Sequence, residues 1–156
     1  MTELVPDVVS RLEQGIDVLD AGCGAGRALA VLASRFPNSR FTGYDLCPDA
    51  IRMAEENAYR NELNNIDFQV VDLARWETKD AFDLITSFDA VHDTKDPQYL
   101  IDAIHRALRP CGVHLMQDIG GSAHLENNID FPFAALLYTI STVHCMPVSL
   151  FCHMIQ

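Results

Sequence analysis

The chain has 156 residues, which suits one domain, and 49% of them are hydrophobic, so a sizeable core can form. Its formal net charge is −11, with 22 acidic against 11 basic residues and no run of Lys or Arg. This balance argues against a nucleic-acid partner, because binding a phosphate backbone depends on clustered basic side chains.

Strand-like and helix-like patterns alternate along the chain. A leading helix is predicted over residues 1–14. The predicted strands cover Ile16–Asp20, Arg40–Asp45, Ile66–Asp72, Phe82–Phe88 and Val113–Asp118. The helices between them are predicted over Ala25–Phe36, Pro48–Leu63 and Pro97–Arg109. This alternation predicts a doubly wound, Rossmann-like α/β fold with a parallel sheet, formed by residues 16–118 of a single domain spanning 1–156.

The segment after the last predicted strand is apolar. From Phe131 to Gln156 there is no Asp, Glu, Lys or Arg, a length that raises the question of a membrane span. Pro132, Pro147 and several polar residues interrupt the segment, and no basic residue flanks it. We therefore expect no membrane span, and predict a buried helix followed by an apolar tail within 119–156.

The cysteines and the N-terminus indicate a reducing compartment. The five cysteines are odd in number and include no Cys-x-x-Cys pair, which favours neither a disulfide framework nor a zinc site. The first fourteen residues lack the basic and apolar regions of a signal peptide. We expect reduced thiols and a cytoplasmic protein.

Three of the predicted strands end at an acidic residue, namely Asp20, Asp45 and Asp72. A doubly wound sheet binds its ligand beyond the carboxyl ends of its strands. One such acid could simply cap the next helix. Three in succession, with a glycine-rich turn after the first, indicate a binding site.

The turn reads Asp-Ala-Gly-Cys-Gly-Ala-Gly over residues 20–26, and its glycines allow a ligand to approach the backbone closely. The dinucleotide fingerprint G-x-G-x-x-G/A does not fit, since its sixth position falls on Arg27 or on Leu29. A phosphate-binding P-loop is also excluded, because the sequence contains no Gly-Lys-Ser/Thr. An NAD-linked oxidoreductase is therefore a weaker interpretation.

The stretch Val18–Gly26 resembles the first motif of class I S-adenosylmethionine (SAM)-dependent methyltransferases. The resemblance continues in order through the stretches Gly43–Leu46, Val71–Leu73, Phe82–Asp89 and Leu108–Val113. In that family the sheet has seven strands. The resemblance implies the strand order 3-2-1-4-5 here, with the last two strands missing.

A narrower resemblance runs from about Leu4 to Leu150. The stretches Phe88–Asp93 and Thr142–Leu150 are similar to a branch whose methyltransferase domain follows an N-terminal winged-helix domain. That domain is absent from this sequence. We interpret the chain as C-terminally truncated relative to the branch.

The resemblance implies roles for the residues of the glycine turn. Gly22, Gly24 and Gly26 are expected to lie under the methionine portion of SAM. Cys23 is expected to face the ligand or the core. Asp20 is expected to orient the loop or to accept a hydrogen bond from the ammonium group of SAM.

The resemblance also assigns residues to the rest of the cofactor. Asp45 is expected to accept hydrogen bonds from both ribose hydroxyls, and Leu46 to lie against the adenine. Asp72 is expected to accept from the exocyclic amine, with the N–H of Leu73 meeting a ring nitrogen. Phe88 is expected to flank the sulfonium and its methyl group.

His92 is the candidate general base, because it follows the fourth strand at the ligand edge. The alternative is that His92 is an ordinary loop residue and that Asp93 caps the next helix. Cys145, Cys152 and His153 lack a fourth ligand at a plausible spacing, so no metal site is predicted.

The sequence thus predicts a SAM-dependent methyltransferase acting on a small-molecule substrate. The alternative is a truncated, catalytically inactive SAM-binding fragment or regulatory isoform. The fifth strand would form an uncovered edge that allows oligomerisation.

Overall fold

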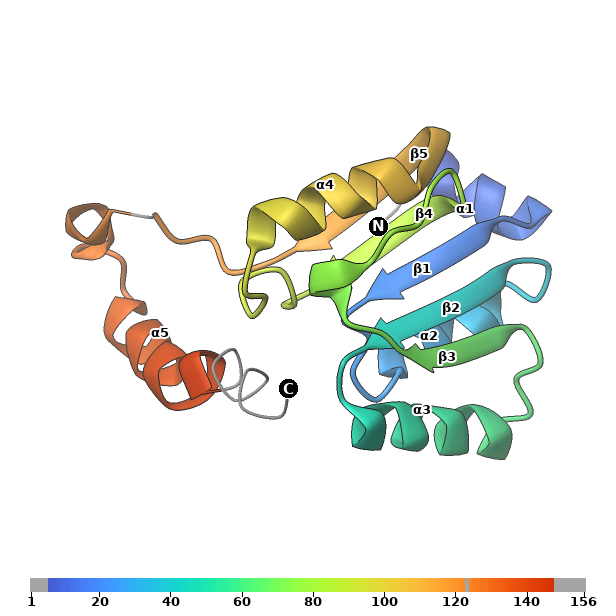
Figure 1. Ribbon diagram of the computed structural model, residues 1–156, viewed down its shortest axis with the longest axis horizontal. Coiled ribbons are helices and arrows are strands. Elements are labelled where there is room, and N and C mark those ends of the chain that lie inside the picture. The colour runs from blue at the N-terminus through green and yellow to red at the C-terminus, as the bar shows by residue number, and fades with distance from the viewer. Residues whose placement is uncertain (1–5, 123, 148–156) are drawn as a thin grey trace.

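The computed structural model describes residues 6–122 and 124–147. Its strands are β1 (Asp17–Ala21), β2 (Arg40–Asp45), β3 (Ile66–Val70), β4 (Phe82–Phe88) and β5 (Leu108–Gln117). They form one parallel sheet in the order β3-β2-β1-β4-β5 (Figure 1). The predicted fold class and strand order are confirmed.

Helices cover both faces of this sheet. They are α1 (Pro6–Gln14), α2 (Arg27–Arg35), α3 (Pro48–Arg60) and α4 (Pro97–Ala107). The first three pack in one buried cluster with Val18, and α4 packs in a second cluster with Leu19. Since successive strand residues point to opposite faces, these neighbours in β1 separate the two halves of the core.

Several boundaries differ from those predicted. Helix α2 begins at Arg27 rather than Ala25, because Gly26 has the left-handed φ of 68°. Strand β3 ends at Val70, so Asp72 lies beyond the strand and caps the 3-10 turn η1 (Leu73–Arg75). Strand β5 already begins at Leu108, with a register shift in its pairing near Phe82 and Leu84.

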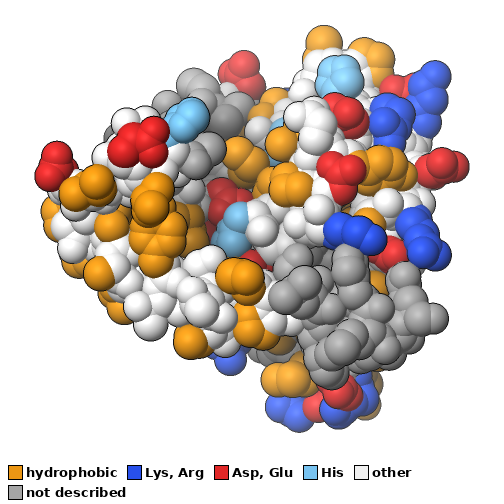
Figure 2. All heavy atoms as spheres, turned by 60° about the vertical axis from the view of Figure 1, so that its left-hand side comes forward, with side chains coloured by type: hydrophobic (Ala, Val, Ile, Leu, Met, Phe, Trp, Pro, Cys, Tyr) orange, Lys and Arg blue, Asp and Glu red, His pale blue; other side chains and the backbone are white. Residues whose placement is uncertain are grey.

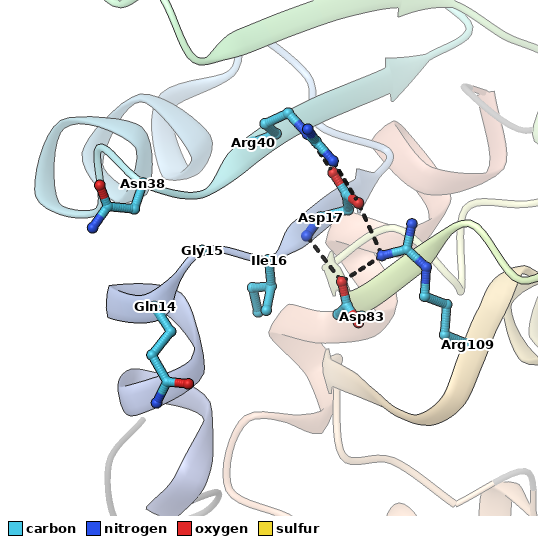
Figure 3. Close-up of a pocket in the computed structure, with 8 residues that line it drawn as sticks. All are labelled: Gln14, Gly15, Ile16, Asp17, Asn38, Arg40, Asp83 and Arg109. Carbon is cyan, nitrogen blue, oxygen red and sulfur yellow. Dashed lines mark hydrogen bonds and ion pairs between the residues drawn. The ribbon is translucent and has the colours of Figure 1, made fainter.

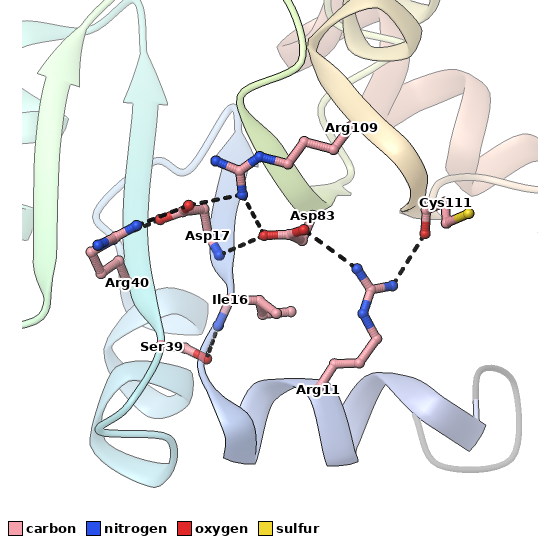
Figure 4. A network of polar contacts seen from close by, with 8 residues as sticks. All are labelled: Arg11, Ile16, Asp17, Ser39, Arg40, Asp83, Arg109 and Cys111. Carbon is pink, nitrogen blue, oxygen red and sulfur yellow. Dashed lines mark hydrogen bonds and ion pairs between the residues drawn. The ribbon is translucent and has the colours of Figure 1, made fainter.

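A network of charged side chains joins the amino-terminal end of the sheet (Figure 4). Arg109 Nη1 lies 2.9 Å from Asp17 Oδ2 and 2.6 Å from Asp83 Oδ2. Arg40 forms an ion pair with Asp17 from the other side, with Nε 2.7 Å from Oδ1. The hydrogen bond from Arg40 lowers the pKa of Asp17, outweighing the effect of burial, and Arg109 lowers it further.

A polar hollow of about 250 Å³ adjoins this network (Figure 3). Its lining residues are Gln14, Gly15, Ile16, Asp17, Asn38, Arg40, Asp83 and Arg109. The hollow lies at the opposite end of the strands from the edge where such sheets bind ligands. We therefore interpret the ion pairs of Asp17 with Arg40 and Arg109 as structural contacts that join strands of the sheet.

The chain beyond β5 forms η2 (Leu125–Asn128), α5 (Ala134–Ile140) and the π-helical turn η3 (Ser141–Cys145), which project from the sheet in Figure 1. The prediction of a buried helix is wrong for α5, since none of its residues is buried. Phe133, just before it, is 62% exposed. Figure 2 shows hydrophobic side chains on the surface of this part of the molecule. Composition alone had suggested burial, but α5 lies against neither core cluster.

None of the helices in the described part of the chain is long and apolar enough to cross a membrane. Cys152 and His153, like Leu4 and the last residues of the Thr142–Leu150 stretch, lie outside the described residues.

Candidate functional site

The glycine turn is held against the end of β2 by its own backbone. The N–H groups of Gly22 and Cys23 both donate to the carbonyl oxygen of Tyr44, at 2.8 and 3.0 Å. Gly24 donates to Oδ2 of Asp45 at 2.8 Å. The turn is therefore fixed in position by residues of the neighbouring strand.

The three glycines meet different surroundings, although all have positive φ. A Cβ on Gly26 would lie 2.6 Å from the Phe68 ring, and one on Gly22 would lie 2.6 Å from Ala90. A Cβ on Gly24 would meet nothing within 4 Å. The turn is thus tightly packed at both ends and open at Gly24, where a ligand can reach its backbone.

Asp45 links the glycine turn to helix α3. Its Oδ1 accepts from the N–H of Cys47 at 2.9 Å while Oδ2 accepts from Gly24. A carboxylate has about four lone-pair positions, so each oxygen can still accept one more hydrogen bond. This capacity is what two ribose hydroxyls require.

Asp20 is only 2% exposed. Its Oδ1 accepts a 2.7 Å hydrogen bond from Thr86 Oγ1 on β4. Burial raises its pKa to about 6, and the nearby Asp45 adds to the rise. Of its two predicted roles, this burial supports the role of orienting the loop. Sequence reasoning missed Thr86, because only the pairing of β1 with β4 brings it beside Asp20.

Cys23 packs against the first core cluster. Burial raises the pKa of its thiol to about 12, and Asp20 and Asp45 raise it further. The side chain is therefore a neutral packing residue at this position.

The other predicted cofactor residues follow the carboxyl ends of β2, β3 and β4. Leu46 is exposed directly after β2, and Phe88 is the last residue of β4. Asp72 accepts from the N–H of Ala74 at 3.0 Å, and Leu73 packs against the second core cluster. The four positions share one edge of the sheet because all strands are parallel (Figure 1).

His92 lies in the loop after β4 and is held by Asp118, the residue that follows β5. Its Nδ1 is 2.5 Å from Asp118 Oδ1, and its N–H donates to Oδ2 at 3.2 Å. Burial would raise the pKa of Asp118, but hydrogen bonds from the N–H of Ile119 and from His92 lower it overall. Asp118 was not identified from sequence as a site residue, although it ends a predicted strand as the other acids do.

The alternative interpretation of Asp93 as a helix cap is wrong. The N-cap of α4 is Asp96, whose side chain accepts from the N–H of Tyr99 at 3.0 Å. Asp93 instead lies beside His92, with Oδ1 3.2 Å from Nε2. Cys145 Sγ from η3 is 3.5 Å from the same nitrogen.

A parallel sheet of order 3-2-1-4-5 with a glycine turn after β1 is a Rossmann-like fold, and solved methyltransferases share it. Residues 12–144 match the family model described as a methyltransferase domain. The chain belongs to this family.

Known relatives are methyltransferases with different acceptors. Trans-aconitate 2-methyltransferase of Azoarcus sp. is 30% identical over 118 residues, covering 74% of this chain and 45% of the relative. Arsenite methyltransferase of Halobacterium salinarum is 26% identical over 126 residues, covering 80% and 32%. The chain thus spans less than half the length of these relatives.

Solved structures agree on the fold. YcgJ of Bacillus subtilis has a TM-score of 0.64 at 26% identity, covering 73% of this chain and 48% of that chain. Coclaurine N-methyltransferase, solved with N-methylheliamine and SAH, has a TM-score of 0.65 at 22% identity, covering 73% and 34%. At 22% identity, the similarity to coclaurine N-methyltransferase concerns the fold alone.

Proposed function

We propose that this chain binds SAM at the carboxyl edge of the sheet and transfers its methyl group to a small-molecule acceptor. The observation that carries the proposal is the hydrogen bond from the N–H of Gly24 to Oδ2 of Asp45. It joins the turn proposed to hold the methionine portion to the carboxylate proposed to hold the ribose. Family membership over residues 12–144 supports the same assignment.

The cofactor is proposed to lie along the edge from β4 to β3. The backbone at Gly22, Gly24 and Gly26 would lie against the methionine portion of SAM. Asp20 would orient this turn. Asp45 would accept from the ribose hydroxyls. Leu46 would lie against the adenine, and the backbone N–H of Leu73 would meet a ring nitrogen.

Asp72 and Phe88 would contact opposite ends of the cofactor. Asp72 would accept from the adenine amine while its Oδ1 still caps η1. Phe88, at the end of β4, would flank the sulfonium. The chemistry is an in-line displacement at the methyl carbon, in which the leaving sulfur loses its positive charge. Catalysis then consists mainly of positioning the acceptor.

A base is needed only for an acceptor that must lose a proton. We assign this role to His92, four residues after Phe88 in the sequence. Its bond to Asp118 fixes the ring orientation. The relatives' names refer to an organic acid and to arsenite, so they do not define one acceptor class for this chain.

The experiment is calorimetric titration with S-adenosylhomocysteine (SAH) of the wild-type chain and of Asp45→Ala. We expect saturable binding to the wild type that is lost in the variant. Asp67→Ala is the matched control, because Asp67 is an exposed acid on the neighbouring β3 and should leave binding unchanged. A wild-type chain that does not bind SAH contradicts the proposal. Binding of NAD in its place would favour an oxidoreductase.

Transfer is tested separately with radiolabelled SAM and a panel of organic acids, amines and thiols. Label transferred to one acceptor class supports the enzyme. SAH binding without transfer to any of them would favour a chain that binds the cofactor without catalysis.

A further inference from the structure

We infer that His92, Asp93 and Cys145 form a binding site for a divalent cation of the zinc class. The three potential ligand atoms are His92 Nε2, Asp93 Oδ1 and Cys145 Sγ, and all lie within 4.8 Å of one another. They come from the loop after β4 and from η3, which are far apart in sequence. The inference does not depend on the proposed methyl transfer.

The distances match a tetrahedral site. Zinc bonds of about 2.0 Å to oxygen or nitrogen and about 2.3 Å to sulfur place tetrahedral ligand atoms about 3.3 to 3.6 Å apart. Nε2 of His92 lies 3.2 Å from Oδ1 of Asp93 and 3.5 Å from Sγ of Cys145. Two of the three pairs of ligand atoms therefore already have tetrahedral spacing, and the third pair lies within 4.8 Å.

The hydrogen bonding of His92 directs Nε2 toward this position. Asp118 is on the other side of the ring, 2.5 Å from Nδ1, and an ionised carboxylate can only accept. In the neutral imidazole Nδ1 then carries the proton and Nε2 has a free lone pair. A metal-bound histidine usually donates the N–H of its other ring nitrogen to a carboxylate, a backbone carbonyl or water.

Asp93 lacks a partner that a cation would supply. Its Oδ1 is buried and accepts no hydrogen bond within the described part of the chain. Leaving a buried acceptor without a partner is unfavourable. When the proton of His92 is on Nδ1, its Nε2 and Oδ1 of Asp93 are two acceptors 3.2 Å apart, and a cation between them would bind both.

The ligand chemistry selects the ion. One imidazole, one carboxylate and one thiolate carry two negative charges, and this mixed set suits zinc rather than magnesium or calcium, which prefer oxygen alone. Three protein ligands leave a fourth position for water or a small ligand, as in catalytic zinc sites.

Metal binding would change the role of His92. Its Nε2 would coordinate the ion and could not accept a proton. An acceptor hydroxyl or thiol bound at the fourth position would instead lose its proton to solvent, because the cation lowers its pKa.

The test is titration of the chelator-treated full chain with zinc chloride by calorimetry, and with cobalt by absorption. We expect one equivalent of metal and a thiolate-to-cobalt charge-transfer band. Cys145→Ser should abolish the band, and Asp93→Asn should weaken zinc binding at least tenfold. Asp118→Asn should keep the stoichiometry but weaken binding by about 10–100-fold.

The matched controls are Cys47→Ser and Cys111→Ser, which remove exposed cysteines elsewhere and should leave the band unchanged. Cys152→Ser identifies any contribution from the residues outside the described part. Circular dichroism checks that each variant folds.

Three results overturn the inference: no metal bound by the wild type, binding unchanged in both Cys145→Ser and Asp93→Asn, or a band that depends on Cys152 alone. Zinc should also protect Cys145 from alkylation. Rapid alkylation that depends on His92 and that zinc does not slow would indicate a thiol–histidine pair instead. Zinc binding without SAH binding would keep this site and reject the proposed cofactor site, and the converse would do the opposite.

Discussion

Asp45 accepts hydrogen bonds from two segments at once, through Oδ2 from Gly24 and through Oδ1 from Cys47. One side chain thus fixes the glycine turn and the beginning of α3. If this preorganises the cofactor site, replacing the carboxylate should affect binding even when the shape of the side chain is kept.

Asp45→Asn should weaken SAH binding by about 10–150-fold, corresponding to about 1.5–3 kcal/mol for a lost charged hydrogen bond. The amide group must turn its NH₂ toward one of the two backbone donors. Calorimetric titration measures the effect, with Asp67→Asn as the control. Equal affinity of the Asp45→Asn and wild-type chains would show that the carboxylate does not contact the ligand.

Two glycines of the turn should respond differently to alanine. Gly26→Ala should cost about 2–5 kcal/mol of folding stability, because its φ is 68° and the new Cβ would lie 2.6 Å from the Phe68 ring. Gly24→Ala should cost only about 1–2 kcal/mol, from its φ of 52° alone. Urea unfolding checks both values. The ranking would be wrong if Gly24→Ala were the less stable protein.

Asp20 should give the protein a pH-dependent stability. Its pKa is about 6 in the fold against an ordinary 3.8, so between these values the folded chain keeps a proton that the unfolded chain loses. Its contribution is therefore full below about pH 4 and is lost as the pH rises through 6, on the order of 2–3 kcal/mol in total. Urea midpoints from pH 4 to 7 should fall in the wild type and fall less in Asp20→Asn. Parallel profiles would contradict the assignment.

Asp17→Asn should cost about 1–3 kcal/mol of stability at pH 7, because Arg109 and Arg40 both lose a half-buried partner. The lowered pKa of Asp17 means that this stability is present above 3.8 and is lost as the pH falls through the folded value. Asp49→Asn is the control, since its side chain in the pair with Arg52 is 84% exposed and such pairs contribute about 0–1 kcal/mol. Thermal unfolding at pH 7 compares the stability of the two variants. Equal losses of stability in Asp17→Asn and Asp49→Asn would mean that the charged network adds nothing to stability.

Met116 lies on β5, the edge strand next to β4, and is 50% exposed. An uncovered edge promotes pairing with other chains, and a charge on it opposes this. We expect the wild-type chain to associate at high concentration and Met116→Lys to associate less, as measured by light scattering. A monomeric wild type that unfolds cooperatively would remove the basis for this prediction.

The sheet could be predicted because its strands are short apolar runs and its helices have their own periodicity. Asp20 and Asp45 could be placed at the ligand edge for the same reason. The end of β3 could not, because Asp72 follows two valines and the strand pattern does not show where pairing stops.

The grouping of His92, Asp118 and Cys145 could not be predicted. It joins residues 26 and 53 positions apart and depends on the path taken after β5. The exposure of α5 could not be predicted either. An apolar composition indicates that a segment favours burial, but it does not indicate which surface covers the segment.

The two carboxylates on β1 act on stability in opposite directions although they are three residues apart. Mild acidification removes the cost of ionising buried Asp20, while stronger acidification removes the attraction that Asp17 exerts on its arginines. Together they give the strand a stability optimum near pH 4, where Asp20 is still protonated and Asp17 is still ionised. In mild acid, this five-residue strand would then add to the relief of self-repulsion that protonation brings to a chain of net charge −11.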